Sequence, residues 1–427
     1  MPTGAHETRK MSHGRYREEL STANSFDANH PGYPMLTALP PVRFTGAQIL
    51  RDGALQRRSL ALADGRITKG PLPEVDMRGY LLLPGIIDLH GVAFERVVAP
   101  SSGTASDIRR CLDLTECEAA SHGVTTAWLA LSWSWEGGIR GPDFAERFLA
   151  VHAACRDRTG TDLRVQIRSE THMIDTANRL LAAIRRHAVD YVIFKNHLGR
   201  AVEALRAGPA TVADGAFRDA QRFERRKAEL QVLLAREKEV PRHLCRLADA
   251  FDTLGVRFGS HADPDGETRE TFSMIGASIA EFPTTRRAAA AAKAMNDPVI
   301  LSAQNVLHGG PRPGCVRATD LIAQKLCDAL ASEDDYSSLA RAAWNLIDRR
   351  LCDLPRAWSM ISEAPADILR LHDRGRLDFG RRADVVAVNA ETRAIEMTIS
   401  GGVLTHLSHE AARRFAVVPR IVALAAE

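Results

Sequence analysis

Four short apolar segments of the sequence each end in a histidine or a glutamate, residue types that bind divalent metal ions. YLLLPGIIDLH ends in His90, DLRVQIRSE in Glu170, DYVIFKNH in His197 and GVRFGSH in His261. Imidazoles and a carboxylate that converge from several strands form the ligand set of a metal-dependent hydrolase. In a two-metal site the carboxylate bridges ions that lie roughly 3.5–4 Å apart and share an activated water.

Each of these residues has a plainer explanation when it is taken alone. A single histidine after a strand is more often a capping or core residue, and Glu170 is more often the salt-bridge partner of a neighbour such as Arg168. Four ligand-type residues at equivalent places in four separate segments are much harder to explain by accident. We therefore predict that the four residues named above are metal ligands.

Two acidic positions elsewhere are candidates for the catalytic proton transfer. Asp263 follows His261 by two residues and is a candidate ligand or general base, although a loop carboxylate is the plainer interpretation. The run SEDDYSS (332–338) follows the apolar segment CDALA and offers Glu333 and Asp334 as the acid of a last strand. A solvated turn or a helix N-cap explains that run equally well.

A glycine- and proline-rich segment, NVLHGGPRPG (305–314), has the composition of a phosphate-binding loop. Its backbone N–H groups, together with Asn305, His308 and Arg312, are candidate contacts to a phosphorylated substrate. Taken alone, such a segment is more often an ordinary loop at the rim of a barrel.

The elements that position these residues are predicted from the alternation of apolar and helical segments. Seven short apolar runs between residues 80 and 305 alternate with longer helical stretches such as RDAQRFERRKAELQVLLAREKEV (218–240). This alternation predicts βαβ units and a parallel sheet, and seven or eight units close most simply into an α/β fold of the (β/α)8 TIM-barrel type. Active sites of such barrels lie at the carboxyl ends of the strands, where the polar residue after each apolar run is found.

The two flanks of the chain have a different texture, in which short alternating segments are separated by Gly and Asp turns. This strand-and-turn pattern covers residues 41–67 and returns at residues 376–408, which predicts one small composite β domain. The expected organisation is a mobile extension over residues 1–40, the β domain over 41–80 and 371–427, and the hydrolase barrel over 81–370.

Composition excludes several classes of protein. The 427 residues are 45% hydrophobic and 26% charged, and the net charge of +3 is too small to indicate a nucleic-acid partner. No stretch approaches the 18 or more apolar residues of a membrane-spanning helix, and the polar N-terminus lacks the apolar region of a secretory signal. Seven cysteines without a C-x-x-C pair fit a reducing compartment, so we expect a cytoplasmic protein.

Two blocks of sequence resemble a known family. LLLPGIIDLH (81–90), followed by GVTT (123–126), resembles the first-strand motif of the amidohydrolase superfamily. GASIAEFPTTRRAAAAAK (276–293) and QNVLHGG (304–310) are more specific, and resemble the phosphonate-pathway branch of alpha-D-ribose 1-methylphosphonate 5-triphosphate diphosphatases of the carbon–phosphorus lyase route. The resemblance spans about residues 42–405. It implies a composite β domain, a metal-dependent barrel, and hydrolysis of that ribosyl triphosphate to the 5-phosphate and pyrophosphate.

The resemblance also implies roles for individual residues. His90 matches the first-strand histidine of the family, and Glu170 in IRSE matches its bridging carboxylate. His197 in FKNH and His261 in GSH match the next two histidine ligands. Asp263 lies where the branch has an acidic pair, of which the first acid is replaced by alanine in this sequence.

The sequence departs from the branch at three places. The first strand of the family reads His-x-Asp, but here Val92 occupies the third position. Ser-Asp-Tyr after the last strand becomes Ser332-Glu333-Asp334, which puts Glu333 where the catalytic aspartate is expected. Ser-His-Ser after the double glycine becomes Pro311-Arg312-Pro313, so that Arg312 remains as a cation for phosphate.

Because valine has no ligand atom, we expect one divalent ion, and two if another residue replaces the missing ligand. His197, His261 and Glu170 are its expected ligands, and the sequence leaves open whether His90 binds as well. Histidine and carboxylate suit Zn, Mn or Fe alike. Glu333 or Asp334 is then expected to deprotonate the water that attacks a phosphoryl centre.

Two alternatives keep the same barrel. In the first, the metal site hydrolyses a C–N bond, as elsewhere in the superfamily. In the second, the chain is a non-catalytic paralogue that binds a phosphorylated ligand or a partner protein. The expected partner is a small phosphorylated substrate, with no nucleic acid and no membrane, and the sequence leaves homo-oligomerisation open.

Overall fold

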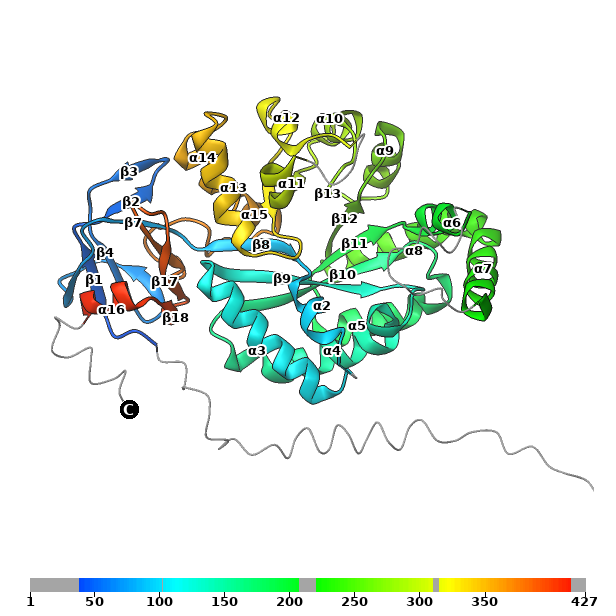
Figure 1. Ribbon diagram of the computed structural model, residues 1–427, viewed down its shortest axis with the longest axis horizontal. Helices are drawn as coiled ribbons and strands as arrows, with labels where there is room; N and C mark the ends of the chain where they lie inside the picture. The colour runs from blue at the N-terminus through cyan, green and yellow to red at the C-terminus, as the bar shows by residue number, and fades with distance from the viewer. Residues whose placement is uncertain (1–37, 102, 207–219, 310–314, 416–427) are drawn as a thin grey trace, which may run out of the picture. The chain divides into compact units, whose positions relative to one another are not determined.

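Eight parallel strands form the central sheet of the protein (Figure 1). The computed structural model describes residues 38–101, 103–206, 220–309 and 315–415. The sheet runs in chain order from β8 to β15, which confirms the predicted (β/α)8 barrel. Its strands are β8 (Ile86–Gly91), β9 (Val124–Trp133), β10 (Asp162–Glu170), β11 (Tyr191–Lys195), β12 (Arg257–His261), β13 (Ala280–Glu281), β14 (Val299–Ser302) and β15 (Ala329–Ala331).

Helices connect successive strands of this sheet, as parallel pairing requires. Their local signals are visible in the sequence: Thr104 is the N-cap residue of α3, and its side chain and that of Asp107 form a reciprocal capping box. The helices of the barrel are α2 (Ala93–Val98), α3 (Ala105–Ser121), α4 (Pro142–Cys155), α5 (Ala177–His187), α6 (Leu198–Arg206), α7 (Ala220–Ala235), α8 (Val240–Leu254), α9 (Gly266–Met274), α10 (Arg286–Ala294), α11 (Ala303–His308), α12 (Ala318–Ala323), α13 (Ser337–Asp348), α14 (Leu354–Ser359) and α15 (Glu363–Ile368).

The barrel strands are covered on both faces, so most of their residues are buried and do not alternate between buried and exposed positions. All residues of β8, β9 and β11 are buried. Close approach of two strands explains one glycine: a Cβ on Gly259 of β12 would lie 2.2 Å from the carbonyl oxygen of Ile279. That position lies two residues before His261, so glycine allows the β12 strand end to reach β13.

Residues from both ends of the chain build the separate β sheets that the flanking texture predicts. In Figure 1 the blue N-terminal strands and the orange-to-red C-terminal strands meet in one six-stranded sheet, ordered β18-β17-β16-β7-β2-β3. A second sheet, β5-β4-β1-β6, is formed by the N-terminal flank alone. These elements are β1 (Val42–Thr45), β2 (Gln48–Arg51), β3 (Ala54–Gln56), β4 (Leu60–Ala63), β5 (Arg66–Thr68), β6 (Glu74–Asp76), β7 (Tyr80–Pro84), β16 (Val385–Asn389), β17 (Ile395–Ser400), β18 (Val403–Leu407) and α16 (His409–Phe415).

One sequence expectation falls on residues that the structure hardly describes. The proposed extension over residues 1–40 lies almost wholly outside the described part. In the part of the chain that is described, no helix combines the length and the apolar character needed to cross a bilayer.

Polar contacts join the last strand to the first at the seam of the barrel. Gly91 and Glu333 form a parallel bridge, and the Glu333 N–H donates to the carbonyl oxygen of His90 at 3.0 Å. The Ser332 hydroxyl donates to Asp88 Oδ2 at 2.6 Å, and the Ser332 N–H donates to Asp88 Oδ1 at 2.9 Å. The side chains of Asp88 and Ser332 are both buried, so the seam depends on the two hydrogen bonds that Ser332 donates to the Asp88 carboxylate.

We predict that Ser332→Ala lowers the free energy of unfolding by about 1–3 kcal/mol, because it leaves a buried carboxylate oxygen of Asp88 without its hydroxyl donor. Urea or thermal denaturation measures the change. Ser106→Ala, at an exposed position of α3, is the matched control and should shift stability by less than about 0.5 kcal/mol. Equal effects of the two substitutions would show that the Asp88–Ser332 contact does not stabilise the seam.

Candidate metal centre

The register of the parallel strands brings four polar residues to the same level at the carboxyl end of the barrel. Glu170 pairs with Lys195, Lys195 with His261, and His261 with Glu281, on the adjacent strands β10 to β13. Each is the last residue of its strand, at the point where an apolar run ends. Residues paired across parallel strands project to the same side of the sheet, so these four side chains share one face.

Two histidines and a glutamate lie together at this mouth. The Glu281 carboxylate lies between the imidazoles: its Oε1 is 3.0 Å from Nδ1 of His90, and its Oε2 is 2.7 Å from Nδ1 of His261. The two imidazole rings are stacked, with centroids 5.6 Å apart and an angle of 23° between their planes. Ligand atoms of His90, His261 and Glu281 all lie within 4.8 Å of one another, which makes them a group able to hold a metal ion.

The charge states of this trio suit metal binding. Burial alone would raise the pKa of the Glu281 carboxyl, but the adjacent His90 and His261 outweigh it and hold this pKa well below its ordinary value. Burial lowers the pKa of His261 to about 4 in spite of the carboxylate beside it. At neutral pH the centre therefore presents an ionised carboxylate and, at His261, a neutral imidazole with a free electron pair.

A second pair of predicted ligands, Glu170 and His197, adjoins the trio. His197 Nδ1 lies 3.7 Å from Glu170 Oε1, and the His197 N–H donates to Glu170 Oε2 at 3.1 Å. Its ring centroid is 6.0 Å from that of His261. Burial, followed by the nearby Lys195, lowers the pKa of His197 to about 2, and burial raises the pKa of Glu170. All four predicted ligands thus lie at one mouth, but the trio within ligand distance contains His90 and Glu281 rather than Glu170 and His197.

Lys195 is the cation among these groups. Its Nζ lies 3.7 Å from Glu170 Oε1, and its side chain is buried. Burial, with the neighbouring charge of Arg168, lowers the pKa of Lys195 to about 8, so that the amine is mostly protonated at neutral pH. Arg168 itself is held by Glu95 and by the hydroxyl of Ser132.

Backbone strain is concentrated where the strands end. Ala262, Phe282 and Glu333 have φ values of 60°, 52° and 59°, a left-handed conformation that is unfavourable for residues other than glycine. Phe282 places its ring edge-on to the imidazoles of His90 and His261, at 5.1 and 5.4 Å. The strained backbone therefore orients the trio and covers it with an aromatic ring.

Of the two acids predicted after the last strand, Glu333 faces the centre. It is half-buried, and burial raises the pKa of its carboxyl, opposed by a hydrogen bond from Ser302 and by the charge of His90. Asp334 is exposed and accepts a hydrogen bond from the side chain of Gln304. The arrangement favours Glu333 over Asp334 as the group that exchanges a proton at the site.

Asp263, the other acidic candidate, belongs to a buried ion pair. Its Oδ2 accepts a hydrogen bond from Ser260 at 2.6 Å and lies 3.3 Å from the guanidinium of Arg269, which is fully buried. The same guanidinium donates to the carbonyl oxygen of Ile279 at 3.1 Å. These contacts hold β12 beside the start of β13, and Asp263 does not enter the mechanism proposed below.

Two of the three residues predicted to bind substrate, Asn305 and His308, lie on α11, the helix that follows β14. Asn305 joins two parts of this region, because its side-chain oxygen accepts from the Ala318 N–H at 3.1 Å. His308 is exposed at the end of α11. Arg312 lies outside the described residues. The geometry therefore gives Asn305 a structural role, because its side chain connects α11 to the start of α12.

The donor atoms present fit a divalent ion. Among the described residues, Glu170 Oε1 and His197 Nε2 are buried and have no hydrogen-bond partner, although buried polar atoms are normally paired. Two imidazoles and a carboxylate are also the protein ligands of several catalytic zinc sites, where a further position stays open to water or substrate. His90, His261 and Glu281 would hold the ion.

Sequence reasoning overlooked two residues of this centre, Glu281 and Lys195. Glu281 is the next-to-last residue of the run GASIAEF, one position before the place that the strand-end rule selects. Lys195 follows the apolar run of β11, two residues before His197. Each residue thus lies close to the position that the strand-end rule selects: Lys195 is two residues before His197, and Glu281 is one residue before Phe282.

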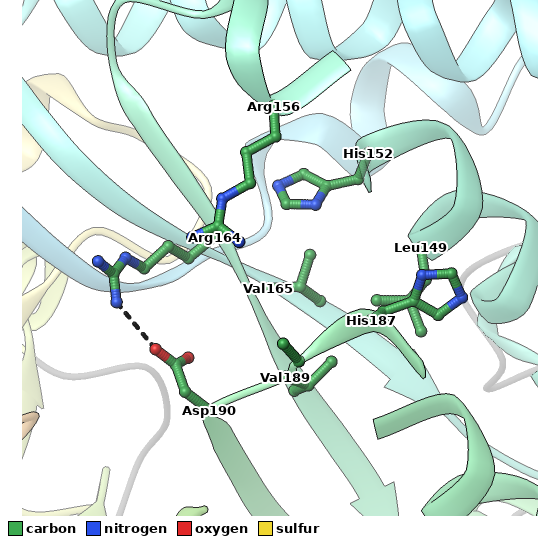
Figure 2. A pocket seen from close by; sticks show the side chains of 9 residues that line it. Leu149, His152, Arg156, Arg164, Val165, His187, Val189 and Asp190 are labelled. Atoms are coloured by element: carbon green, nitrogen blue, oxygen red, sulfur yellow. Dashed lines mark hydrogen bonds and ion pairs between the residues drawn. The ribbon is translucent and has the colours of Figure 1, made fainter. Parts of the chain in front are cut away.

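A small pocket elsewhere in the barrel is separate from this centre. It has room for about 30 Å³, which is enough for a water molecule. Figure 2 shows that Arg164, near the start of β10, and Asp190, just before β11, approach each other there, joined by an ion pair of 2.9 Å. The pocket therefore lies at the amino ends of these strands, and its lining residues are Leu149, His152, Arg156, Arg164, Val165, His187, Ala188, Val189 and Asp190.

Comparison with known proteins relates the chain to one enzyme by sequence. It is 27% identical over 357 residues to the alpha-D-ribose 1-methylphosphonate 5-triphosphate diphosphatase of Escherichia coli strain K12, and the match covers 79% of this chain and 93% of that enzyme. The chain is a divergent relative of this diphosphatase. No family model matches the chain.

Several solved structures share the fold of this chain. A Xaa-Pro dipeptidase is 13% identical with a TM-score of 0.59, and the match covers 85% of this chain and 99% of that one. The N-acetylglucosamine-6-phosphate deacetylase of Pasteurella multocida is 12% identical with a TM-score of 0.58, with the same coverage of 85% and 99%. The likeness of these two structures to this chain is one of fold.

We predict that Glu281→Gln weakens divalent-ion binding by about 10- to 100-fold, because the amide lacks the charge that holds both imidazoles. Titration calorimetry with Zn²⁺ and Mn²⁺ measures the affinity. Glu270→Gln, at an exposed position on α9, is the control and should bind as the unsubstituted protein does. Unchanged affinity in Glu281→Gln would remove this residue from the centre.

Proposed function

We propose that the chain is a metal-dependent phosphoric anhydride hydrolase of the diphosphatase type. Its proposed substrate is alpha-D-ribose 1-methylphosphonate 5-triphosphate, and its products are the 5-phosphate and pyrophosphate. The observation that carries the proposal is the sequence match to the diphosphatase, which covers 93% of that enzyme. The trio of His90, His261 and Glu281 supports it, because it offers a metal site at the mouth where barrel enzymes act.

The residues of the chain divide the chemistry among them. When bound, a divalent ion supplies Lewis-acid chemistry, lowering the pKa of a water and stabilising negative charge on a phosphoryl group. Glu333 accepts the proton of the attacking water, a task that suits a half-buried carboxylate whose pKa burial has raised. Phe282 and the buried strand ends keep bulk water from the imidazoles.

Removal of the metal is expected to abolish pyrophosphate release from the ribosyl triphosphate. Purified protein is treated with a chelator, dialysed, and assayed before and after addition of Zn²⁺, Mn²⁺ or Fe²⁺. Activity should return with at least one of the three ions. Full activity in chelator-treated protein with no detectable metal would contradict the proposal.

Glu333→Gln is expected to lower kcat at least 100-fold while the bound metal is retained, because glutamine cannot accept a proton. Asp334→Asn is the matched control at the adjacent, exposed position and should stay within about threefold of the unsubstituted enzyme. Loss of activity in Asp334→Asn alone would assign the base to Asp334 instead.

A second candidate function is hydrolysis of a C–N bond at the same centre. It is favoured by the fold, which the chain shares with a dipeptidase and with a sugar-phosphate deacetylase. Dipeptides and N-acetylglucosamine 6-phosphate are therefore the comparison substrates. Turnover of these compounds without pyrophosphate release from the triphosphate would favour this second function.

A further inference from the structure

Lys195 occupies a central place in the row of strand-end residues. It pairs in register with Glu170 on one side and with His261 on the other. Its side chain is only 5% exposed, and its Nζ lies 3.7 Å from Glu170 Oε1. In the described part of the chain this ammonium makes no hydrogen bond, so its three N–H donors are not committed to the protein.

The surrounding charges leave Glu170 as the carboxylate closest to Lys195. Arg168, the neighbouring cation, is bound to Glu95 at 3.1 Å and to Ser132 at 2.9 Å. Glu281 lies between the two imidazoles of the trio. Glu170 Oε1 has no hydrogen-bond partner among the described residues. A fixed positive charge thus stands beside a buried carboxylate oxygen next to the candidate metal site.

This ammonium also disfavours a second metal ion. Glu170 and His197 are the other predicted ligands at the mouth, and Lys195 lies against the Glu170 carboxylate that a second ion would use. Among the described residues, only the trio of His90, His261 and Glu281 brings three ligand atoms within 4.8 Å of one another, and this group does not include Glu170 or His197. The Lys195 ammonium and a divalent ion beside the same buried carboxylate would repel each other.

We propose that Lys195 takes the place of a second divalent ion, so that the centre works with one metal ion and one ammonium. On this assignment, which rests on the proposed function, the uncommitted N–H donors of Lys195 bind an oxygen of the substrate's phosphate chain. Glu170 acts through Lys195 as a positioning residue, because its carboxylate holds the ammonium at the mouth.

The test compares Lys195→Met and Lys195→Arg with Lys238→Met, a control at an exposed lysine. The number of divalent ions per chain is measured by elemental analysis, and binding of inorganic pyrophosphate to the metal-loaded protein is measured by calorimetry. We expect one ion per chain in all four proteins. Pyrophosphate affinity should fall at least 10-fold in Lys195→Met, recover at least in part in Lys195→Arg, and be unchanged in Lys238→Met.

Three results would overturn the assignment: two ions per chain in the unsubstituted protein, loss of the ion in Lys195→Met, or unchanged pyrophosphate affinity in a Lys195→Met protein with the thermal midpoint of the unsubstituted chain. If Lys195→Met fails to fold, the comparison of Lys195→Arg with Lys195→Gln replaces it, with the same expected order of affinities. Failure of the proposed function is recognised separately, as absence of triphosphate hydrolysis in an unsubstituted protein that binds both the ion and pyrophosphate.

Discussion

A carboxylate with no access to solvent, Glu281, lies between two imidazoles, and the rest of the centre depends on this arrangement. Burial of an ionised carboxylate is costly unless its oxygens are paired, and here each oxygen faces the Nδ1 of a different histidine. Gln166 adds a third contact, donating to Oε1 at 2.9 Å. The buried carboxylate is stable only while His90 and His261 stay beside it, so its burial keeps the two imidazoles aligned.

The barrel supports this arrangement from two directions. At the seam, Asp88 and Ser332 join β8 to the end of β15, which fixes His90 near Glu333. Between β12 and β13, Arg269 connects the Ser260–Asp263 turn to the backbone before Glu281. Neither set of contacts includes a proposed ligand side chain. They act on the strands that carry the ligands, and so account for how left-handed residues persist at the strand ends.

Much of the architecture followed from local pattern, because a barrel strand and its polar last residue are adjacent in the sequence. That rule located His90, Glu170, His197 and His261 at one mouth. The strand-and-turn texture of the two flanks predicted, separately, that they share a sheet. It could not select the trio within ligand distance, since His90 and Glu281 lie far apart in the chain and meet only through barrel closure.

The overlooked residues show where local pattern fails. The strand that carries Glu281 has only two residues, and its glutamate lies one position before the end of the run GASIAEF, so the strand-end rule does not select it. Asp263 is the converse case. Its position after His261 suggested chemistry, but its partner is a buried arginine on the following helix, and no spacing rule predicts that ion pair.

Position 92 contributes to the barrel seam through its backbone alone. The backbone N–H of Val92 donates to the carbonyl oxygen of Glu333 at 2.6 Å, which any residue except proline can do. The contribution of position 92 to the seam is therefore independent of its side chain, and a ligand can be lost there without loss of the fold. With one ion fewer, the mouth has less positive charge to balance the three carboxylates of Glu170, Glu281 and Glu333. A buried lysine in register with Glu170 and His261 is an economical way to supply that charge, since it is fixed by the same strand pairing that brings the ligands together.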